Sequence, residues 1–334
     1  MLFGEHLDMA QITEPTSPSQ VKRKLGAGVR NRGDRLFFGI TTAASNVAFA
    51  LVLLILVFLV IQAWPAFQKQ GFSFVFGSTW DAEKNILQIG PMIYGSLVIA
   101  GLGVLIATPL AIATAYLITF VFKKSWASIA TNMVDLLAAL PSVIIGLWGV
   151  LVFTPIAQGW AEFLNKYFSW IPIFSVSKDT NNLSSSPFIA SWVVAVMIVP
   201  IITSVTREIF SQFDKDLISG ALALGATRWT VFRRVILPTA SGGITGGVLL
   251  GLGRAIGETV AIYYVLQLSM DINLFRILEP KGGAVASWIL SRFGEATEDE
   301  FHGLMAAGFV IFLVTLVINL LANIIVTKAQ PWRK

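Results

Sequence analysis

The 334-residue sequence contains no cysteine and only two histidines, His6 and His302. Without cysteine there can be no disulfide, no iron–sulfur cluster and no thiolate zinc site. Two separate histidines cannot form a metal site alone. The G-x-x-x-x-G-K-[ST] pattern of a P-loop is also missing, so this chain cannot bind ATP phosphates by that route. We therefore expect no cofactor or metal on this chain and no enzymatic activity of its own.

Charged residues are scarce. They make up 13% of the chain, whereas 55% of its residues are hydrophobic. An ordinary soluble domain carries about 25% charged residues. So little charge cannot cover a water-exposed surface, and the composition predicts an all-α polytopic membrane protein.

Six apolar runs have about the 20-residue length that a bilayer requires. Pro109 lies inside the second run, and Pro141 interrupts the third, so both helices are expected to be kinked. The predicted spans cover approximately residues 41–64, 91–122, 132–157, 187–210, 242–267 and 303–326.

The positive charges indicate how the chain is oriented. Of the 24 Lys and Arg, sixteen fall in the N-terminal tail, the Lys123-Lys124 turn, the segment 207–237 and the C-terminus. Seven fall in the alternate loops, 65–90, 159–186 and 268–302, and Arg254 lies inside a span. Because cytoplasmic loops are enriched in Lys and Arg, both termini are expected in the cytoplasm.

These features divide the chain into four parts. We expect a flexible basic cytoplasmic tail over 1–36, the first span and an outer loop over 37–90, a membrane-embedded core over 91–327 and a cytoplasmic C-terminus over 328–334.

The cytoplasmic segment 211–238 is long and patterned. Asp214 to Leu224 is expected to be helical, Gly225 ends that helix, and Thr227 caps a second helix that runs to Val235. Leu237-Pro238 is expected to close the second helix. The result would be a helix–turn–helix on the cytoplasmic face of the membrane.

This segment resembles the EAA loop of bacterial binding-protein-dependent importer permeases. In that family the loop docks into a cleft of the cytoplasmic ATPase. Ser219 and Gly220 replace the Glu and first Ala of the motif, so the salt bridge of that Glu is not implied here. The alternative is an interfacial hairpin that only anchors the protein. The residues that carry the resemblance are Ser219, Gly220, Ala221, Gly225, Ala226, Trp229, Leu237 and Pro238.

The fifth span contains two charged residues, Arg254 and Glu258, which are four residues apart. On one continuous helix they would share a face and could pair. Charged side chains in a membrane usually face the bundle interior or a water-filled path. Gly251, Gly253 and Gly257 leave room for another helix or a solute. Two interpretations stay open: a transport path or gate, and a structural ion pair.

Two stretches, Leu249–Glu258 and Asp135–Gly149, resemble the phosphate-specific PstC-type permeases. The second includes Pro141-Ser142-Val143. The resemblance implies a type-1 (MetI-like) ABC importer permease fold and phosphate as the cargo. It also implies a PstA-type second permease, a PstB-type ATPase dimer that uses ATP and a PstS-type extracytoplasmic phosphate-binding protein. The pathway residues that it suggests are Arg254, Glu258, Asp135 and Ser142.

The sequence leaves alternative functions open. The same machinery could carry molybdate, sulfate or another small solute. An ion-coupled secondary transporter would use Arg254 and Glu258 as a relay, but it predicts an inverted repeat that the sequence does not show. A membrane-bound enzyme lacks a recognisable set of catalytic residues.

Overall fold

The computed structural model describes residues 32–178, 180, 182–271 and 275–329. Most of the predicted tail (1–36) and the last five residues lie outside this part of the chain. The described chain falls into two units, one ending at Leu54 and the other starting at Ile55. The long first helix, α1 (Arg32–Gln70), belongs to both. The candidate site lies in the second unit.

The elements after α1 are almost all helical. In chain order they are α2 (Ser73–Phe76), β1 (Trp80–Asp81), β2 (Ile86–Leu87), α3 (Gly90–Tyr116), η1 (Leu117–Val121), α4 (Lys124–Ala139), α5 (Ser142–Trp148), η2 (Gly149–Phe153), α6 (Thr154–Phe168), η3 (Pro172–Phe174), α7 (Pro187–Ser211), α8 (Lys215–Ala223), α9 (Arg228–Val231), η4 (Phe232–Ile236), α10 (Leu237–Ile256), α11 (Val260–Val265), α12 (Val285–Arg292) and α13 (Glu298–Ala329). Three of these, η1, η2 and η4, are single turns of π-helix.

Six helical stretches of the described chain are long and apolar enough to cross a membrane, as predicted. They cover Gly33–Gln70, Gly90–Val121, Ser142–Phe168, Pro187–Ser211, Arg228–Ile256 and Glu298–Ile324. The large number of exposed Leu, Ile, Val and Phe side chains on them fits a surface that faces lipid.

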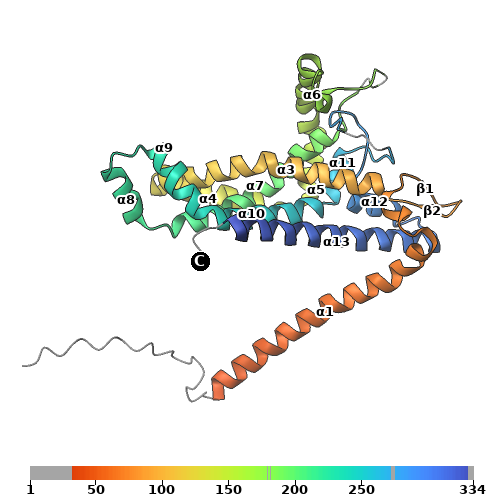
Figure 1. Cartoon of the computed structure of the whole chain (residues 1–334), viewed down its shortest axis with the longest axis horizontal. Coiled ribbons are helices and arrows are strands. Elements are labelled where there is room, and N and C mark those ends of the chain that lie inside the picture. The colour runs from red at the N-terminus through yellow and green to blue at the C-terminus, as the bar shows by residue number, and fades with distance from the viewer. Residues whose placement is uncertain (1–31, 179, 181, 272–274, 330–334) are drawn as a thin grey trace, which may run out of the picture. The chain divides into compact units, whose positions relative to one another are not determined.

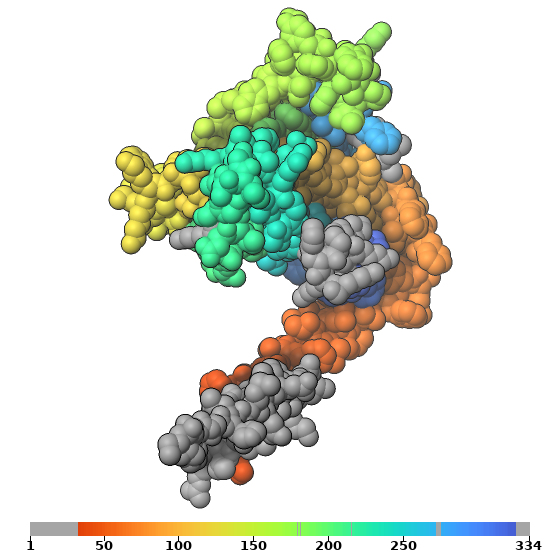
Figure 2. Space-filling view, turned by 60° about the vertical axis from the view of Figure 1, so that its left-hand side comes forward, coloured from red at the N-terminus to blue at the C-terminus, as the bar shows by residue number. Residues whose placement is uncertain are grey.

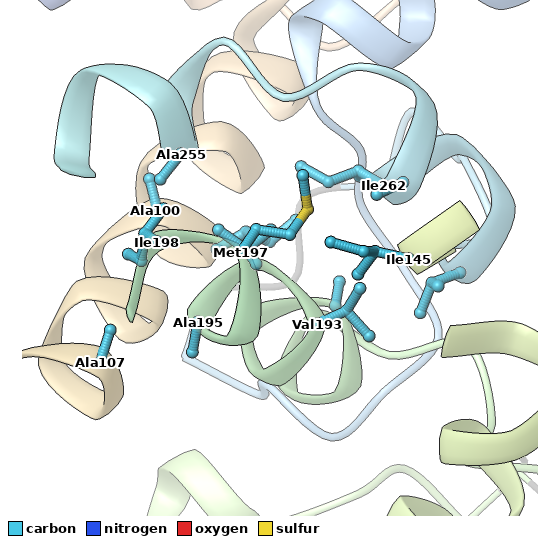
Figure 3. Packing of buried hydrophobic residues seen from close by; sticks show 14 of the residues in the cluster. Ala100, Ala107, Ile145, Val193, Ala195, Met197, Ile198, Ala255 and Ile262 are labelled. Carbon is cyan, nitrogen blue, oxygen red and sulfur yellow. The ribbon is translucent and has the colours of Figure 1, made fainter. Parts of the chain in front are cut away.

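Helix α7 is the central span, because 61% of its apolar stretch is buried, more than in the other five. It packs against α3 and α10, and α13 packs on the far side of α10 (Figure 1). Small residues allow the close approach. Ala100 and Ala107 on α3 and Ala255 on α10 lie beside Ile198 of α7 in one buried cluster (Figure 3).

The third predicted span differs from the structure. Residues 132–157 do not form one kinked helix, because α4 ends at Ala139 and a new helix begins at Ser142. Leu140 and Pro141 are extended between them. A residue before proline avoids helical angles, so the chain turns there instead of bending within a helix.

The loop after α1 contains a short structure that the sequence did not predict. β1 and β2 form an antiparallel pair in which Trp80 lies opposite Leu87. Trp80 also stacks edge-on against Trp288 of α12 and donates a hydrogen bond from its indole nitrogen to Glu300 of α13. The pair therefore ties this end of the bundle to α12 and α13, while α8 and α9 lie at the opposite end (Figure 1).

Candidate substrate pathway and coupling hairpin

Arg254 and Glu258 do not share one helix. Helix α10 ends at Ile256, Gly257 caps it, and α11 begins at Val260. Neither residue belongs to any of the ion pairs found among the described residues. The predicted i,i+4 pair is therefore wrong. After the break, the Glu258 carboxylate accepts a hydrogen bond from the Ala261 amide, 3.2 Å away, in the first turn of α11.

The polar groups that this break releases find other partners. The Thr259 hydroxyl donates to the Gly257 carbonyl oxygen at 3.2 Å. The fully buried Ser287 hydroxyl of α12 donates to the Thr259 carbonyl oxygen at 2.8 Å, and this oxygen also accepts from the Tyr263 amide of α11 at 3.1 Å. A break in a membrane helix is tolerated where neighbouring groups satisfy the freed backbone. This interruption is accordingly built into the packing of α10, α11 and α12.

The two charged residues differ in exposure. Glu258 is only 8% exposed, whereas Arg254 is exposed on the surface of this chain. Leu250, one turn before Arg254, is 61% exposed. A charged side chain that faces lipid costs about 2.5–3.5 kcal/mol on insertion scales. In the membrane, this face of α10 is therefore expected to border a water-filled path or another protein subunit.

Ser142 lies at the level of the same break. A Cβ on Gly146 of α5 would lie 2.8 Å from Cα of Ala261 in α11, and one on Gly149 would lie 3.0 Å from the Val265 side chain. The step from Gly146 to Gly149 along the chain matches the step from Ala261 to Val265. Helices α5 and α11 therefore run in the same direction and begin at about the same level. The start of α5 at Ser142 is therefore near the level of Gly257–Thr259 along this helix pair. The N-terminus of a helix favours negative charge.

Asp135 is not brought into this group. It lies on α4, before the extended residues Leu140 and Pro141, and it is exposed. It forms no ion pair with another described residue. Of the four predicted pathway residues, the structure places Ser142 and Glu258 at the break, Arg254 one turn before it and Asp135 on a separate helix.

The predicted helix–turn–helix is present between α7 and α10. Asp214 caps α8 by accepting a hydrogen bond from the Asp216 amide. Gly225 has a φ of +84°, which a glycine adopts readily. Its amide donates to the Leu222 carbonyl, and the Ala226 amide donates to the Ala221 carbonyl. This pair of bonds is the Schellman arrangement that ends many helices.

The second helix of this hairpin starts as predicted but does not end at Leu237-Pro238. The Thr227 hydroxyl accepts from the Thr230 amide and caps α9. The chain then remains helical through η4 into α10. Proline lacks the amide needed for an ordinary helical bond and crowds the preceding turn. The wider π-turn over Phe232–Ile236 directly before Pro238 allows the helix to continue.

The tip of this coupling hairpin (residues 214–236) presents apolar side chains to its surroundings. Leu224 is 90% exposed and Trp229 is 66% exposed. Its base is anchored by a buried cluster that includes Phe210, Val231 and Ile236. An exposed apolar tip on an anchored base is the form expected of a docking element.

A comparison with protein families identifies the chain. The family described as binding-protein-dependent transport system inner membrane component matches residues 107–334. The chain belongs to this family.

Several curated relatives of the permease are named phosphate transport system permease protein PstC. The protein from Xylella fastidiosa is 33% identical over 322 residues, which cover 95% of this chain and 98% of that protein. The protein from Haemophilus influenzae is 34% identical over 310 residues, covering 89% and 94%. This agrees with the PstC-type resemblance of the two sequence stretches.

The fold also agrees with a solved importer. A bacterial ABC transporter involved in the import of the acidic polysaccharide alginate has a chain that superposes with a TM-score of 0.50 at 19% identity. The match covers 88% of the permease and 99% of that chain. The permease thus has the all-helical, MetI-like fold that the sequence predicted.

Sequence reasoning missed two buried carboxylates in the permease, Glu279 and the partner of Trp80, Glu300. Glu279, 1% exposed, accepts hydrogen bonds from the Ser177 amide and hydroxyl and pairs with Arg276 at 3.1 Å. Burial opposes ionisation of Glu279, but the hydrogen bonds from Ser177 and Arg276 outweigh it and hold the pKa of this carboxyl below its usual value. The sequence did not predict that Glu279 is buried and hydrogen-bonded, because a single Glu in a loop matches no motif. Glu279 joins the loops 169–186 and 266–284.

The described residues contain no cluster of three or more His, Asp or Glu that could hold a metal ion.

Proposed function

We propose that this permease moves inorganic phosphate into the cell across the cytoplasmic membrane. It would do so as one of two permease subunits, beside a PstA-type partner. ATP would be hydrolysed by a separate PstB-type ATPase dimer, and a PstS-type binding protein would deliver phosphate from outside. The sequence identity between this chain and the PstC relatives, which extends over nearly the whole chain, supports this proposal.

Exposed Arg254 supports an anionic cargo. A guanidinium group binds a tetrahedral oxyanion through two hydrogen bonds. The start of the helix at Ser142 would add backbone amides at the same level. Glu258 lies one turn away and is fixed by its bond to the Ala261 amide. Its negative charge would weaken the hold of Arg254 on the anion, and an ion that is held too firmly does not leave.

The second permease subunit would cover the Arg254 face of α10 and so enclose the path. The coupling hairpin would dock on the ATPase through its tip, around Ser219, Gly220, Leu224 and Trp229. Closure of the ATPase dimer would then move the bundle through the anchored base of the hairpin. Both termini and this hairpin would be cytoplasmic, because most of the Lys and Arg lie on that side.

The cargo is tested by uptake into vesicles that contain the assembled complex, its binding protein and internal ATP. We expect uptake of radioactive phosphate, and we expect a hundredfold excess of molybdate or sulfate to leave it nearly unchanged. Strong competition by molybdate or sulfate, with weak competition by unlabelled phosphate, would assign another oxyanion to the same machinery. Uptake without the ATPase subunits would instead indicate a secondary transporter.

A further inference from the structure

Helix α6 stands apart from the bundle. It leaves the bundle at a steep angle to α3, α7 and α10 (Figure 1), and with the loop after it forms a lobe at the top of Figure 2. By length and composition, α5, η2 and α6 together could make one membrane crossing. The contacts along α7 point to a different path for α6.

Two positions on this segment contact neighbouring residues of α7. A Cβ on Gly149 would lie 3.0 Å from the Val193 side chain, and the ring of Trp160 lies 5.5 Å from that of Trp192. Eleven residues of helix advance about 16 Å. A helix that ran antiparallel alongside α7 from Val193 would carry Trp160 past Pro187, the first residue of α7, and one that ran parallel would carry it away from Trp192. Helix α6 therefore runs across α7 more than along it.

Helix α6 also has three distinct faces. Ala157 and Ala161 are fully buried, and Ala161 packs on Leu183 and Leu278 from the loops opposite the coupling hairpin. A second face is polar, with Gln158, Glu162 and Lys166 at four-residue spacing, and the Gln158 amide donates to Glu162 at 2.9 Å. The third face is apolar and about half exposed. It consists of Ile156, Trp160, Phe163 and Tyr167.

We propose that α6 lies in the plane of the membrane at its outer lipid–water interface and does not cross the bilayer. Its aromatic face would rest among the lipid headgroups and upper acyl chains, where Trp and Tyr rings are favoured. Its polar face would meet water. A crossing α6 would instead expose Glu162 and Lys166 to hydrocarbon. The crossing before α7 is then made by α4, α5 and η2, over residues 124–153, which exceeds the roughly 20 residues required.

The absence of cysteine from the chain makes this placement measurable, because a single introduced cysteine carries the only label. Nitroxide labels would be placed at Ile156, Phe163 or Tyr167 and, separately, at Glu162 or Lys166. The assembled complex would be studied in phosphatidylethanolamine–phosphatidylglycerol vesicles. Collision with oxygen reports lipid exposure, and collision with a nickel chelate reports water exposure. Val47 and Leu54 are seven residues apart on α1, as Ile156 and Phe163 are on α6. The difference in membrane depth between labels at Val47 and Leu54 is therefore the reference for a helix that crosses the bilayer.

We expect labels at Ile156, Phe163 and Tyr167 to be oxygen-accessible and to lie at one depth. Labels at Glu162 and Lys166 should favour the nickel chelate. A depth that changes from Ile156 to Phe163 by as much as from Val47 to Leu54 would overturn the proposal and make α6 a crossing helix. Aromatic-face labels shielded from both reagents would also overturn it, since the second permease subunit would then cover this face. Should Phe163→Cys fail to assemble, Ile156 and Tyr167 are compared with Ile40 and Leu51 on α1, because both pairs are eleven residues apart.

Discussion

The ring of Tyr116, in the last turn of α3, lies 4.6 Å from the ring of Phe232 at the base of the coupling hairpin. Phe120 of η1 extends this contact, at 5.4 Å from Tyr116 and 5.7 Å from Phe210 of α7. The rings thus join the hairpin to the ends of two spans. Because side chains in a packed cluster move together, we infer that motion of the hairpin reaches the bundle through them.

Replacing Phe232 with Ala should therefore separate ATP hydrolysis from transport. We expect the complex to assemble and to hydrolyse ATP, while phosphate uptake per ATP falls several-fold. The loss of a fully buried Phe costs about 3–5 kcal/mol, and the half-buried Phe232 should cost less, so the fold should survive. Tyr116→Phe keeps the ring contact and is the matched control. Unchanged uptake per ATP in Phe232→Ala would contradict this role.

Gly225 should tolerate only residues that adopt a positive φ. A Cβ there meets no atom within 4 Å, so the constraint is the backbone angle and not space within this chain. A left-handed conformation costs an ordinary L-residue about 1–2 kcal/mol, and Asn less than most. We expect Gly225→Val to reduce co-purification of the ATPase, and Gly225→Asn to retain more of it. Equal retention by the two variants would rule out the turn as the basis of docking.

The orientation can be measured with an impermeant thiol reagent applied to intact cells. We expect a cysteine at Ser185, in the loop before α7, to react. A cysteine at Thr227, in the coupling hairpin, should react only after the cells are opened. Reaction at position 227 in intact cells would reverse the proposed topology.

The Glu279 contacts should make stability depend on pH. Because the pKa of folded Glu279 lies below the ordinary value of about 4.3, its stabilising effect is complete above that value and is lost as pH falls through the folded-state pKa. Hydrogen bonds to a charged group contribute about 1.5–3 kcal/mol. We expect Glu279→Gln to lower the thermal unfolding temperature at pH 7 and to have a smaller effect in strong acid. An equal difference at both pH values would contradict an ionised Glu279.

Local signals in the sequence were enough to predict the coupling hairpin. Asp214, Gly225 and Thr227 act within a few residues of their own positions, so their capping roles follow from the sequence alone. The six spans were predictable for a similar reason, because a bilayer demands long apolar runs.

The break between Arg254 and Glu258 was not predictable in this way. Glycine at 257 permits a helix as well as a break. In the structure, Ser287, almost 30 residues later, donates a hydrogen bond to the Thr259 carbonyl oxygen, which also accepts from the Tyr263 amide. The continuation of α9 through Pro238 likewise depends on a π-turn that has no sequence signature. Neither position therefore carries a sequence pattern that predicts its conformation.

Arg254 provides the most direct test of the account, through phosphate uptake per assembled complex for Arg254→Gln. Lys166→Gln, which removes an exposed positive charge from α6, is the matched control. We predict that Arg254→Gln assembles but loses nearly all uptake, that Arg254→Lys retains part of it, and that Lys166→Gln transports normally. Full phosphate uptake by assembled Arg254→Gln complexes would contradict the proposal that Arg254 lies on the transport path.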